Sequence, residues 1–417
     1  MAVVPIYIGS FESLKGVKRP KNAAARKKSN NPLEDSDSES ESITESLSAN
    51  DAWMFPVFGS AVLFSLYLLF RFLDKEYINY LLTGYFALLG CAAVAKVGLL
   101  VSKKTMPAGI LKHVEKYKIT INVYNASFTF IHALLLAASI FLTLFYVLTK
   151  NWIASNVFGL SFAINAIQLL SLDSFKTGMI LLSGLFFYDI FWVFGTEVMV
   201  SVAKNFDAPI KLVWPRDIIG VLAGTLEKTE FSMLGLGDIV IPGIFVALCL
   251  RFDQHQAWQH NPKGDFRSTK FARPYFMACS TAYVIGLLTT FVVMHTFQAA
   301  QPALLYLSPA CILSALITAA VRGELKELFA YSTEEDNEDA KKNKNESKKT
   351  KKDMVTAVEE TQTEEKPSPN TAAEEEVDTN ADADAEDEDY VALNAEDIKN
   401  SPKISKKKKG GKKKNGK

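Results

Sequence analysis

The stretch LLSGLFFYDIFWVFGTEVMV, residues 181–200, places Asp189 deep inside an apolar run. A second run, MLGLGDIVIPGIFVALCL at residues 233–250, contains Asp238. An ionised carboxylate in the hydrocarbon of a membrane costs about 2.5–3.5 kcal/mol on insertion scales, so a residue of this kind is expected to be functional. Two of them, on two different apolar runs, indicate a pair of cooperating acids.

The charged residues are segregated along the chain. Its 417 residues include 46 basic and 46 acidic side chains, and 48% of them are hydrophobic. The charges crowd into residues 15–46 and 332–417, whereas the middle is a series of apolar runs. The mean hydropathy of +0.08 therefore averages a membrane body and polar tails. This composition predicts an all-α, polytopic membrane protein embedded in a lipid bilayer, and we expect no nucleic-acid partner.

The apolar runs predict the membrane spans, because a helix needs about 20 predominantly apolar residues to cross the hydrocarbon. The sequence predicts eight complete spans, several of them bordered by Trp or Tyr, as is typical of the membrane interface. They are residues 53–73, 78–100, 125–148, 152–172, 177–200, 231–250, 274–296 and 302–321.

Lysine and arginine in the short loops predict the orientation, because cytosolic loops carry an excess of these residues. The basic segments are residues 15–28, 101–124 and 251–273, together with the Lys-rich C-terminal end. Eight crossings put all four on one side, which is therefore predicted to be cytosolic. The loop at 201–230 is then luminal or extracellular.

The charged ends of the chain are predicted to be disordered. The acidic, serine-rich run EDSDSESESITES at 34–46 and the Glu- and Lys-rich residues 332–417 cannot form a core. Phosphorylation of the run and lipid contact by the Lys-rich end are open alternatives to plain solvation. The formal glycosylation sequons at Asn125 and Asn345 fall on the predicted cytosolic side or at the membrane edge, so we expect neither to be used.

The four cysteines do not indicate a disulfide framework or a zinc site. Cys91, Cys249, Cys279 and Cys311 lie in or at the edge of apolar runs, and no two are spaced as CxxC. We expect free thiols that act as small buried hydrophobic groups. The chain has no Walker A, GxSxG, HExxH or Rossmann motif, which argues against a serine or metal intramembrane protease. We expect no metal and no cofactor.

The two acids have different local settings. Asp189 lies near the middle of its predicted span beside Tyr188, whose phenol could donate to a carboxylate or to a substrate. A helix–helix hydrogen bond and an ion pathway are alternative roles for it. Asp238 follows Gly235 and Gly237, each of which weakens a helix by about 1 kcal/mol and permits close backbone approach. Pro242 has no N–H for the Asp238 carbonyl, so the helix is expected to be loosened at this acid.

The stretch Gln301-Pro302-Ala303-Leu304 is expected to interrupt the last span. Pro302 and Pro309 each remove a backbone donor. Non-helical backbone at membrane depth is tolerated only beside a cavity or packed protein. A strand-like segment here could bind an extended peptide by strand addition. The alternative is a proline kink at a helix start.

Two carboxyls that share one proton have the chemistry of an aspartic protease, in which one acid activates water and the other protonates the carbonyl. Intramembrane carboxylates also relay ions in transporters, where broken helices occur as well. The sequence shows no internal repeat, which argues against a transporter. A non-catalytic membrane chaperone is a third alternative. The remaining polar residues of the spans are expected to make packing hydrogen bonds or to snorkel; they are Lys96, His132, Asn165, Gln168, Glu197 and His295.

Three motifs resemble those of presenilin-type intramembrane aspartyl proteases. Tyr188-Asp189, Gly235-Leu236-Gly237-Asp238 and Gln301-Pro302-Ala303-Leu304 match the YD, GxGD and PAL motifs, in that order on three predicted spans. The surrounding segments FFYDIFWVFGTEVMV, APIKLVWP, MLGLGDIVIPGIF and QPALLYLSPACI are similar to the signal peptide peptidase branch. The resemblance covers residues 53–331.

The resemblance implies a presenilin-like helical bundle with Asp189 and Asp238 as the catalytic pair. The supporting residues it implies are Tyr188, Gly235, Gly237, Gln301, Pro302, Ala303 and Leu304. It also implies a multi-pass protein of the endoplasmic reticulum membrane, with a cytosolic C-terminus, that self-associates. Its substrates would be type II-oriented transmembrane segments, chiefly remnant signal peptides and type II membrane proteins.

The same resemblance predicts the division of the chain. Family members have nine spans, so residues 1–14 are expected to be the remnant of a first span, truncated here. Residues 15–52 would be a disordered cytosolic segment, residues 53–331 the protease domain, and residues 332–417 a disordered cytosolic tail.

Overall fold

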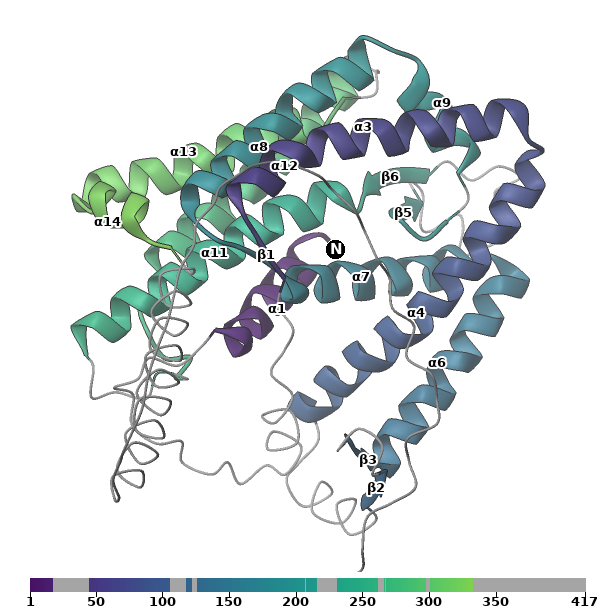
Figure 1. Cartoon of the computed structure of the whole chain (residues 1–417), viewed down its shortest axis with the longest axis horizontal. Helices are drawn as coiled ribbons and strands as arrows, with labels where there is room; N and C mark the ends of the chain where they lie inside the picture. Colours follow the sequence, from purple (N-terminus) through teal and green to yellow (C-terminus); the bar gives the residue numbers. More distant parts are fainter. Residues whose placement is uncertain are drawn as a thin grey trace, which may run out of the picture. The chain divides into compact units, whose positions relative to one another are not determined.

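Helices dominate the structure, a computed structural model (Figure 1). It describes residues 1–17, 45–105, 118–121, 126–206, 208–215, 231–261, 266, 268–297 and 301–332. The chain divides into two units, Met1–Lys351 and Lys352–Lys417, and the second lies outside the described residues. The asparagines of the two formal sequons, Asn125 and Asn345, and most of the predicted disordered segments lie outside them too.

The long helices carry most of the described chain, and α3 lies along α8 while α4 lies along α6 (Figure 1). The helix bounds are α1 Val3–Ser13, α3 Ala49–Phe72, α4 Lys75–Thr105, α6 Phe130–Thr149, α7 Trp152–Leu169, α8 Phe175–Asp189, α9 Val198–Asn205, α11 Gly237–His260, α12 Pro274–Phe297, α13 Leu304–Arg322 and α14 Leu325–Ala330. Two short segments complete them: the 3₁₀ turn η1, Leu14–Gly16, and the π-helical turn η2, Ile190–Phe194.

The prediction of a helical membrane bundle is confirmed. Among the described residues, seven helical stretches are long and apolar enough to cross a membrane. They are α3, α4, α6 from Ile131, α7, the continuous stretch Phe175–Phe194, α12 and α13, and they coincide with seven of the eight predicted spans. The eighth predicted span corresponds to α11, which is 24 residues long. It is not among the seven apolar stretches, since polar residues occur at both of its ends. The total of eight crossings therefore stays a prediction.

Short polar residues and glycine set several helix ends. At the start of α3, the Ser48 hydroxyl accepts from the Asp51 N–H and the Asp51 carboxylate accepts from the Ser48 N–H, which forms a capping box. At the start of α8, the Ser174 hydroxyl accepts from the Thr177 N–H. Gly323, with φ of 73°, ends α13 in the left-handed conformation that glycine adopts without steric cost.

Helix α11 is the most enclosed element, and every residue from 242 to 254 is buried. Helices α1 and α7 pack against it. A Cβ added at Gly243 would stand 2.6 Å from a side-chain carbon of Ile167 on α7 and 3.3 Å from one of Ile6 on α1. Glycine at 243 therefore allows the close approach of both helices. The predicted span remnant at residues 1–14 is helical and covers one side of α11.

The cysteines largely confirm the expectation of small buried hydrophobic groups. All four are free thiols, and Cys249, Cys279 and Cys311 are buried on α11, α12 and α13. Cys91 is only half-buried, and its Sγ lies 3.3 Å from the Ser139 hydroxyl.

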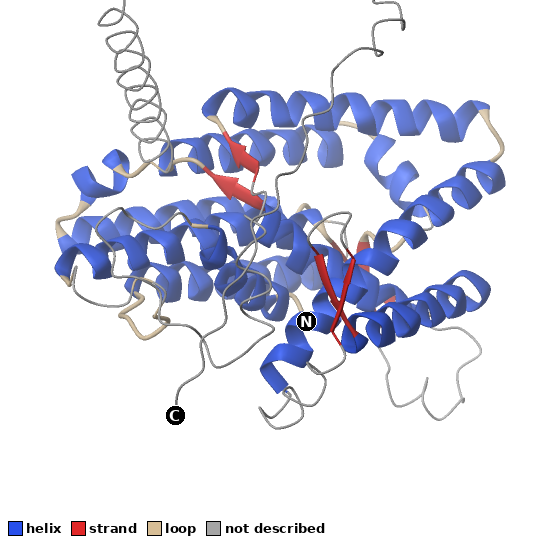
Figure 2. Ribbon diagram, turned by 60° about the horizontal axis from the view of Figure 1, so that its bottom comes forward, coloured by secondary structure: helices blue, strands red, loops and turns tan. Residues whose placement is uncertain are grey.

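Short strands add to the helical fold (Figure 2). The described residues contain three two-stranded sheets: parallel β1 Glu45–Leu47 with β4 Leu170–Leu172, antiparallel β2 Lys118–Ile121 with β3 Ala126–Thr129, and antiparallel β5 Lys211–Pro215 with β6 Phe231–Gly235. The predicted helix starts at 125 and 231 are therefore wrong. In β6 the exposure of side chains alternates from residue to residue, which is the period of a strand.

The predicted span at 177–200 ends earlier than expected. Its helix changes to the π-helical turn after Asp189, and the chain leaves the helix at Gly195 before α9 begins at Val198. The predicted packing role of polar residues is seen for Asn165, whose amide donates to the carbonyls of Ala93 (3.2 Å) and Ser161 (2.8 Å).

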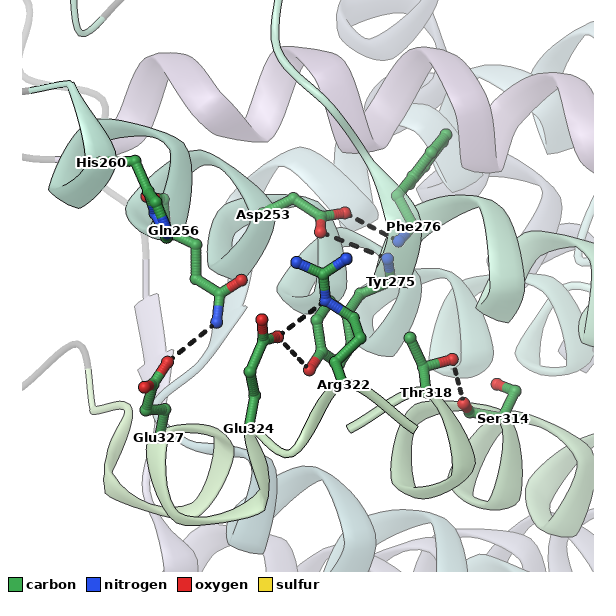
Figure 3. A network of polar contacts seen from close by, with 10 residues as sticks. All are labelled: Asp253, Gln256, His260, Tyr275, Phe276, Ser314, Thr318, Arg322, Glu324 and Glu327. Carbon is green, nitrogen blue, oxygen red and sulfur yellow. Dashed lines mark hydrogen bonds and ion pairs between the residues drawn. The ribbon is translucent and has the colours of Figure 1, made fainter. Parts of the chain in front are cut away.

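A polar network joins the ends of α11, α12 and α13 (Figure 3). The Asp253 carboxylate on α11 accepts from the backbone N–H groups of Tyr275 (3.2 Å) and Phe276 (2.8 Å), so it caps the start of α12. The Tyr275 hydroxyl donates to Glu324 (2.7 Å), which also pairs with Arg322 (2.9 Å). Burial tends to raise the pKa of Glu324, but these hydrogen bonds outweigh it and hold that pKa below its usual value.

Replacing Asp253 by Ala should lower the free energy of unfolding by about 1–3 kcal/mol, since two buried N–H groups lose their acceptor. The measurement is denaturant unfolding of the purified protein in detergent. The matched control is Gln259→Ala on the exposed face of the same helix, expected to change stability by less than about 0.5 kcal/mol. Equal stability of the two variants would contradict the capping role.

Candidate active site

Asp189 is the last residue of α8 and is only 4% exposed. The backbone N–H of Leu304, at the start of α13, donates a hydrogen bond to its carboxylate. Tyr188 is half-buried and lies close enough to interact electrostatically with Asp189, as expected of its position in the sequence. The π-helical turn follows directly, and such turns occur frequently at functional sites.

Asp238 is the second residue of α11, immediately after strand β6. The Gly235 N–H donates to its carboxylate, and a Cβ added at Gly235 would stand only 3.2 Å from Asp238 Oδ2. Glycine therefore lets β6 pass directly beside the acid. A Cβ added at Gly237 would meet no atom within 4 Å, so this side is open. The acid lies at a helix start and not, as expected, in a loosened helix interior.

The Asp238 carbonyl has the unusual environment that Pro242 predicts. Pro242 lies inside α11 and has no N–H to donate to that carbonyl. The hydroxyl of Tyr283 on α12 donates to it instead, at 3.4 Å. Tyr283 is 1% exposed. The sequence analysis missed this residue, because a phenol inside an apolar span was its only signal.

The two predicted acids lie together. Their carboxyls are close enough to interact electrostatically, although Asp189 and Asp238 are on different helices. Asp189 is also tied through Leu304 to the third motif. Three segments far apart in the sequence therefore meet at one site, and each contributes one of the predicted motifs.

The Gln301–Leu304 stretch is a non-helical approach to α13. Residues 301–303 are outside the helix, Pro302 and Ala303 are buried, and α13 begins at Leu304. The first N–H groups of a helix have no intrahelical acceptor, which leaves that of Leu304 available to Asp189. The helix runs through Pro309, so the expectation of a second break there is wrong. The described residues of this stretch form no strand, and the alternative of a proline at a helix start is what the structure has.

Within the described part of the chain, no group of three or more His, Cys, Asp or Glu side chains could hold a metal ion. The site offers instead two carboxyls, backbone donors and a phenol. A bundle of membrane helices that brings a buried carboxyl and a half-buried one together is the arrangement of an intramembrane aspartyl protease, in which the pair activates water without a metal.

Known proteins resemble the chain over most of its length. The sequence model of the family described as signal peptide peptidase matches residues 39–335. The human signal peptide peptidase is 41% identical over 344 residues, which are 81% of this chain and 82% of that protein. The mouse signal peptide peptidase is 42% identical over the same shares. Intramembrane protease 2 of Caenorhabditis elegans is 50% identical over 216 residues, 50% of this chain and 44% of that protein.

The chain belongs to the signal peptide peptidase family. It is an intramembrane aspartyl protease, a multi-pass membrane protein that acts on substrates embedded in the lipid bilayer.

Replacing Tyr283 by Phe should lower kcat about threefold to tenfold, the effect of losing a hydrogen bond of about 0.5–1.5 kcal/mol beside the acid. The change removes one oxygen and keeps the ring, so the fold should persist. Activity on a transmembrane peptide in detergent is the measurement. The control is Tyr80→Phe, at a side chain that is 72% exposed. An unchanged kcat in Tyr283→Phe would show that the hydroxyl does not support the site.

Proposed function

We propose that Asp189 and Asp238 are the catalytic pair of this protease. The observation that carries the proposal is that α8 and α11 bring two carboxyls within electrostatic reach, while a backbone N–H of Leu304 holds one of them. The Asp189 side chain is almost fully buried, and that of Asp238 is half-buried. Taking a carboxyl out of water costs free energy, so a pair of acids in apolar surroundings fits a catalytic role.

The proposed reaction is hydrolysis of a peptide bond by water. One carboxylate takes a proton from the water as the water oxygen attacks the scissile carbonyl carbon, and the other carboxyl donates its proton to the carbonyl oxygen. The result is a gem-diol. Its C–N bond then breaks when the amide nitrogen receives a proton from one acid and a hydroxyl proton returns to the other. The pair titrates as a unit, so neither role is assigned to one residue.

Glycine residues at the site support the access of substrate. The space next to Gly237 is free of other atoms, and Gly235 brings the backbone of β6 to the Asp238 carboxylate. A helical substrate hides its amide groups in intrahelical hydrogen bonds, so it must unwind before its carbonyl reaches the acids. Residues that weaken a helix should therefore favour cleavage.

The proposed substrates are type II-oriented transmembrane segments. They are chiefly signal peptides that remain in the membrane after signal peptidase has cut them from their proteins. The human and mouse relatives are named signal peptide peptidases, and this supports the assignment. The charge distribution of the loops supports an orientation with a cytosolic C-terminus. We further propose location in the endoplasmic reticulum membrane and self-association.

The test of the pair uses purified protein in detergent and a synthetic signal peptide. Asp189→Ala and Asp238→Ala should each lower kcat by about 10²–10⁴-fold or more, since each removes a proton-transferring group. Asp189→Asn and Asp238→Asn keep the side-chain shape and should be as inactive. The control is Asp253→Asn, a buried acid on α11 outside the site, which should retain activity. Wild-type rates in either alanine variant would disprove the proposal.

The proposed substrate preference predicts a second result. A signal peptide with a Gly or Pro near its centre should be cleaved faster than one with Leu there, because either residue lowers helix stability by about 1–3 kcal/mol. The same sequence inserted in the opposite orientation in proteoliposomes should resist cleavage. Mass spectrometry of the fragments gives rates and positions. Equal cleavage in both orientations would refute the type II assignment.

A further inference from the structure

The π-helical turn after Asp189 has a hydrogen bond that the proposed chemistry does not use. Residues 190–194 form this turn, and Asp189 immediately precedes it. A π-helical turn is rare, since its i→i+5 hydrogen bonds leave it wider than an α-helix. A wide turn next to a buried acid needs contacts that keep it from changing to the more stable α-helical form. Reversion would rotate the following residues and shift the end of α8.

One side of the turn packs against α3. The Trp192 side chain is 9% exposed, and its Nε1–H donates to the Ser60 hydroxyl at 2.9 Å. The Ser60 hydroxyl in turn donates to the Pro56 carbonyl at 2.8 Å. The Ser60 hydroxyl proton therefore points toward the Pro56 carbonyl. A lone pair of the same oxygen accepts the hydrogen bond from the Trp192 indole N–H. The two bonds form a short chain from the backbone of α3 to the residue three positions after Asp189.

Small residues bring the two helices together at this point. A Cβ added at Gly184 on α8 would stand 2.9 Å from Pro56 Cγ, and one added at Gly59 would stand 3.6 Å from the Tyr188 ring. Positions 184 and 188 on α8 and position 192 in η2 are four residues apart, so they lie along one side of this continuous helical stretch. That face lies against α3, whereas Phe187, Phe191 and Phe194 are 68%, 60% and 56% exposed.

Ser60 is a polar residue on the side of α3 that contacts α8. Most of this helix is exposed, and Ala52, Pro56, Gly59 and Ser60 belong to its more buried side. A hydroxyl gives less packing than a methyl-rich side chain, so its presence there is explained by the bond from Trp192. Interhelical hydrogen bonds of this kind contribute only modestly to membrane-helix association. Their larger effect is on the geometry of the groups next to them.

We propose that the Trp192–Ser60 hydrogen bond holds the π-helical turn in register and so fixes the direction of the Asp189 carboxyl toward Asp238. Ser60 and Trp192 are then positioning residues, which act through Asp189 and do not contact substrate. The inference rests on the proposed catalytic role of Asp189 and Asp238. It assigns a function to α3, which contributes no residue to the three motifs.

The test compares Ser60→Ala, Trp192→Phe and the double variant in the full-length protein. Each single variant should lower kcat about fivefold, the factor that one neutral hydrogen bond supplies, with KM changed less than about twofold. The double variant should lose no more than either single one, because both remove the same bond. Ser60→Thr keeps the hydroxyl and should restore most of kcat.

A pH profile separates positioning from a general loss of stability. A changed separation of the two carboxyls alters their coupling, so the pH of maximal kcat should shift in Ser60→Ala and in Trp192→Phe. Ser65→Ala and Trp53→Phe, at exposed positions of the same helix, make the same chemical changes and should leave kcat and profile unchanged. Unfolding in detergent, measured for every variant, should differ little from wild type.

The outcomes distinguish this inference from the proposed function. Wild-type kcat and pH profile in Ser60→Ala and Trp192→Phe would overturn the positioning role, and so would losses that multiply in the double variant. If Trp192→Phe does not fold, Ser60→Ala and its rescue by Ser60→Thr decide the question. Asp189→Ala and Asp238→Ala run in the same assay. Activity retained in those two would instead overturn the catalytic pair itself.

Discussion

The contact that the site depends on is the hydrogen bond from the Leu304 N–H to the Asp189 carboxylate. A buried carboxylate without partners costs several kcal/mol, so it must be supplied with donors. A continuous helix has no spare N–H groups except in its first turn. A backbone donor can therefore come only from a helix start or from non-helical backbone at that depth, and α13 begins at this position. Asp238 receives its donor from Gly235, the last residue of strand β6, just before α11 begins.

Both acids thus use interruptions of regular helix, which proline and glycine produce. Pro302 keeps the chain out of the helix before Leu304, and Gly235 lets strand β6 approach the carboxylate. Pro242 has a further consequence, because it leaves the Asp238 carbonyl to the Tyr283 hydroxyl. Irregular backbone is tolerated in a membrane only where packed protein or a cavity surrounds it. The burial of Pro302, Leu304 and Tyr283 satisfies that condition.

The sequence predicted the long helices well, because apolar length is a strong signal, and the two acids that it singled out lie close together. The prediction of secondary structure was wrong where a single apolar run contains both a strand and a helix. Phe231–Gly235 is as apolar as the helix that follows, so the run alone did not separate strand β6 from α11. The π-helical turn and the contact of Tyr283 depend on tertiary packing. No local pattern distinguishes Trp192 from the aromatic residues around it, because its bond partner lies 132 residues away in the sequence.

The enclosure of α11 explains why its sequence departs from that of a simple membrane span. Other helices surround residues 242–254, so their side chains contact protein and the apolar requirement of lipid contact is relaxed. Arg251, Asp253 and Gln254 are all buried there, and Asp253 finds its donors at the start of α12. Helices at the lipid boundary, such as α3, are exposed and apolar instead. A membrane helix that carries polar and acidic residues is thus best placed inside the bundle, where α12 provides polar partners and α1 and α7 provide the close packing.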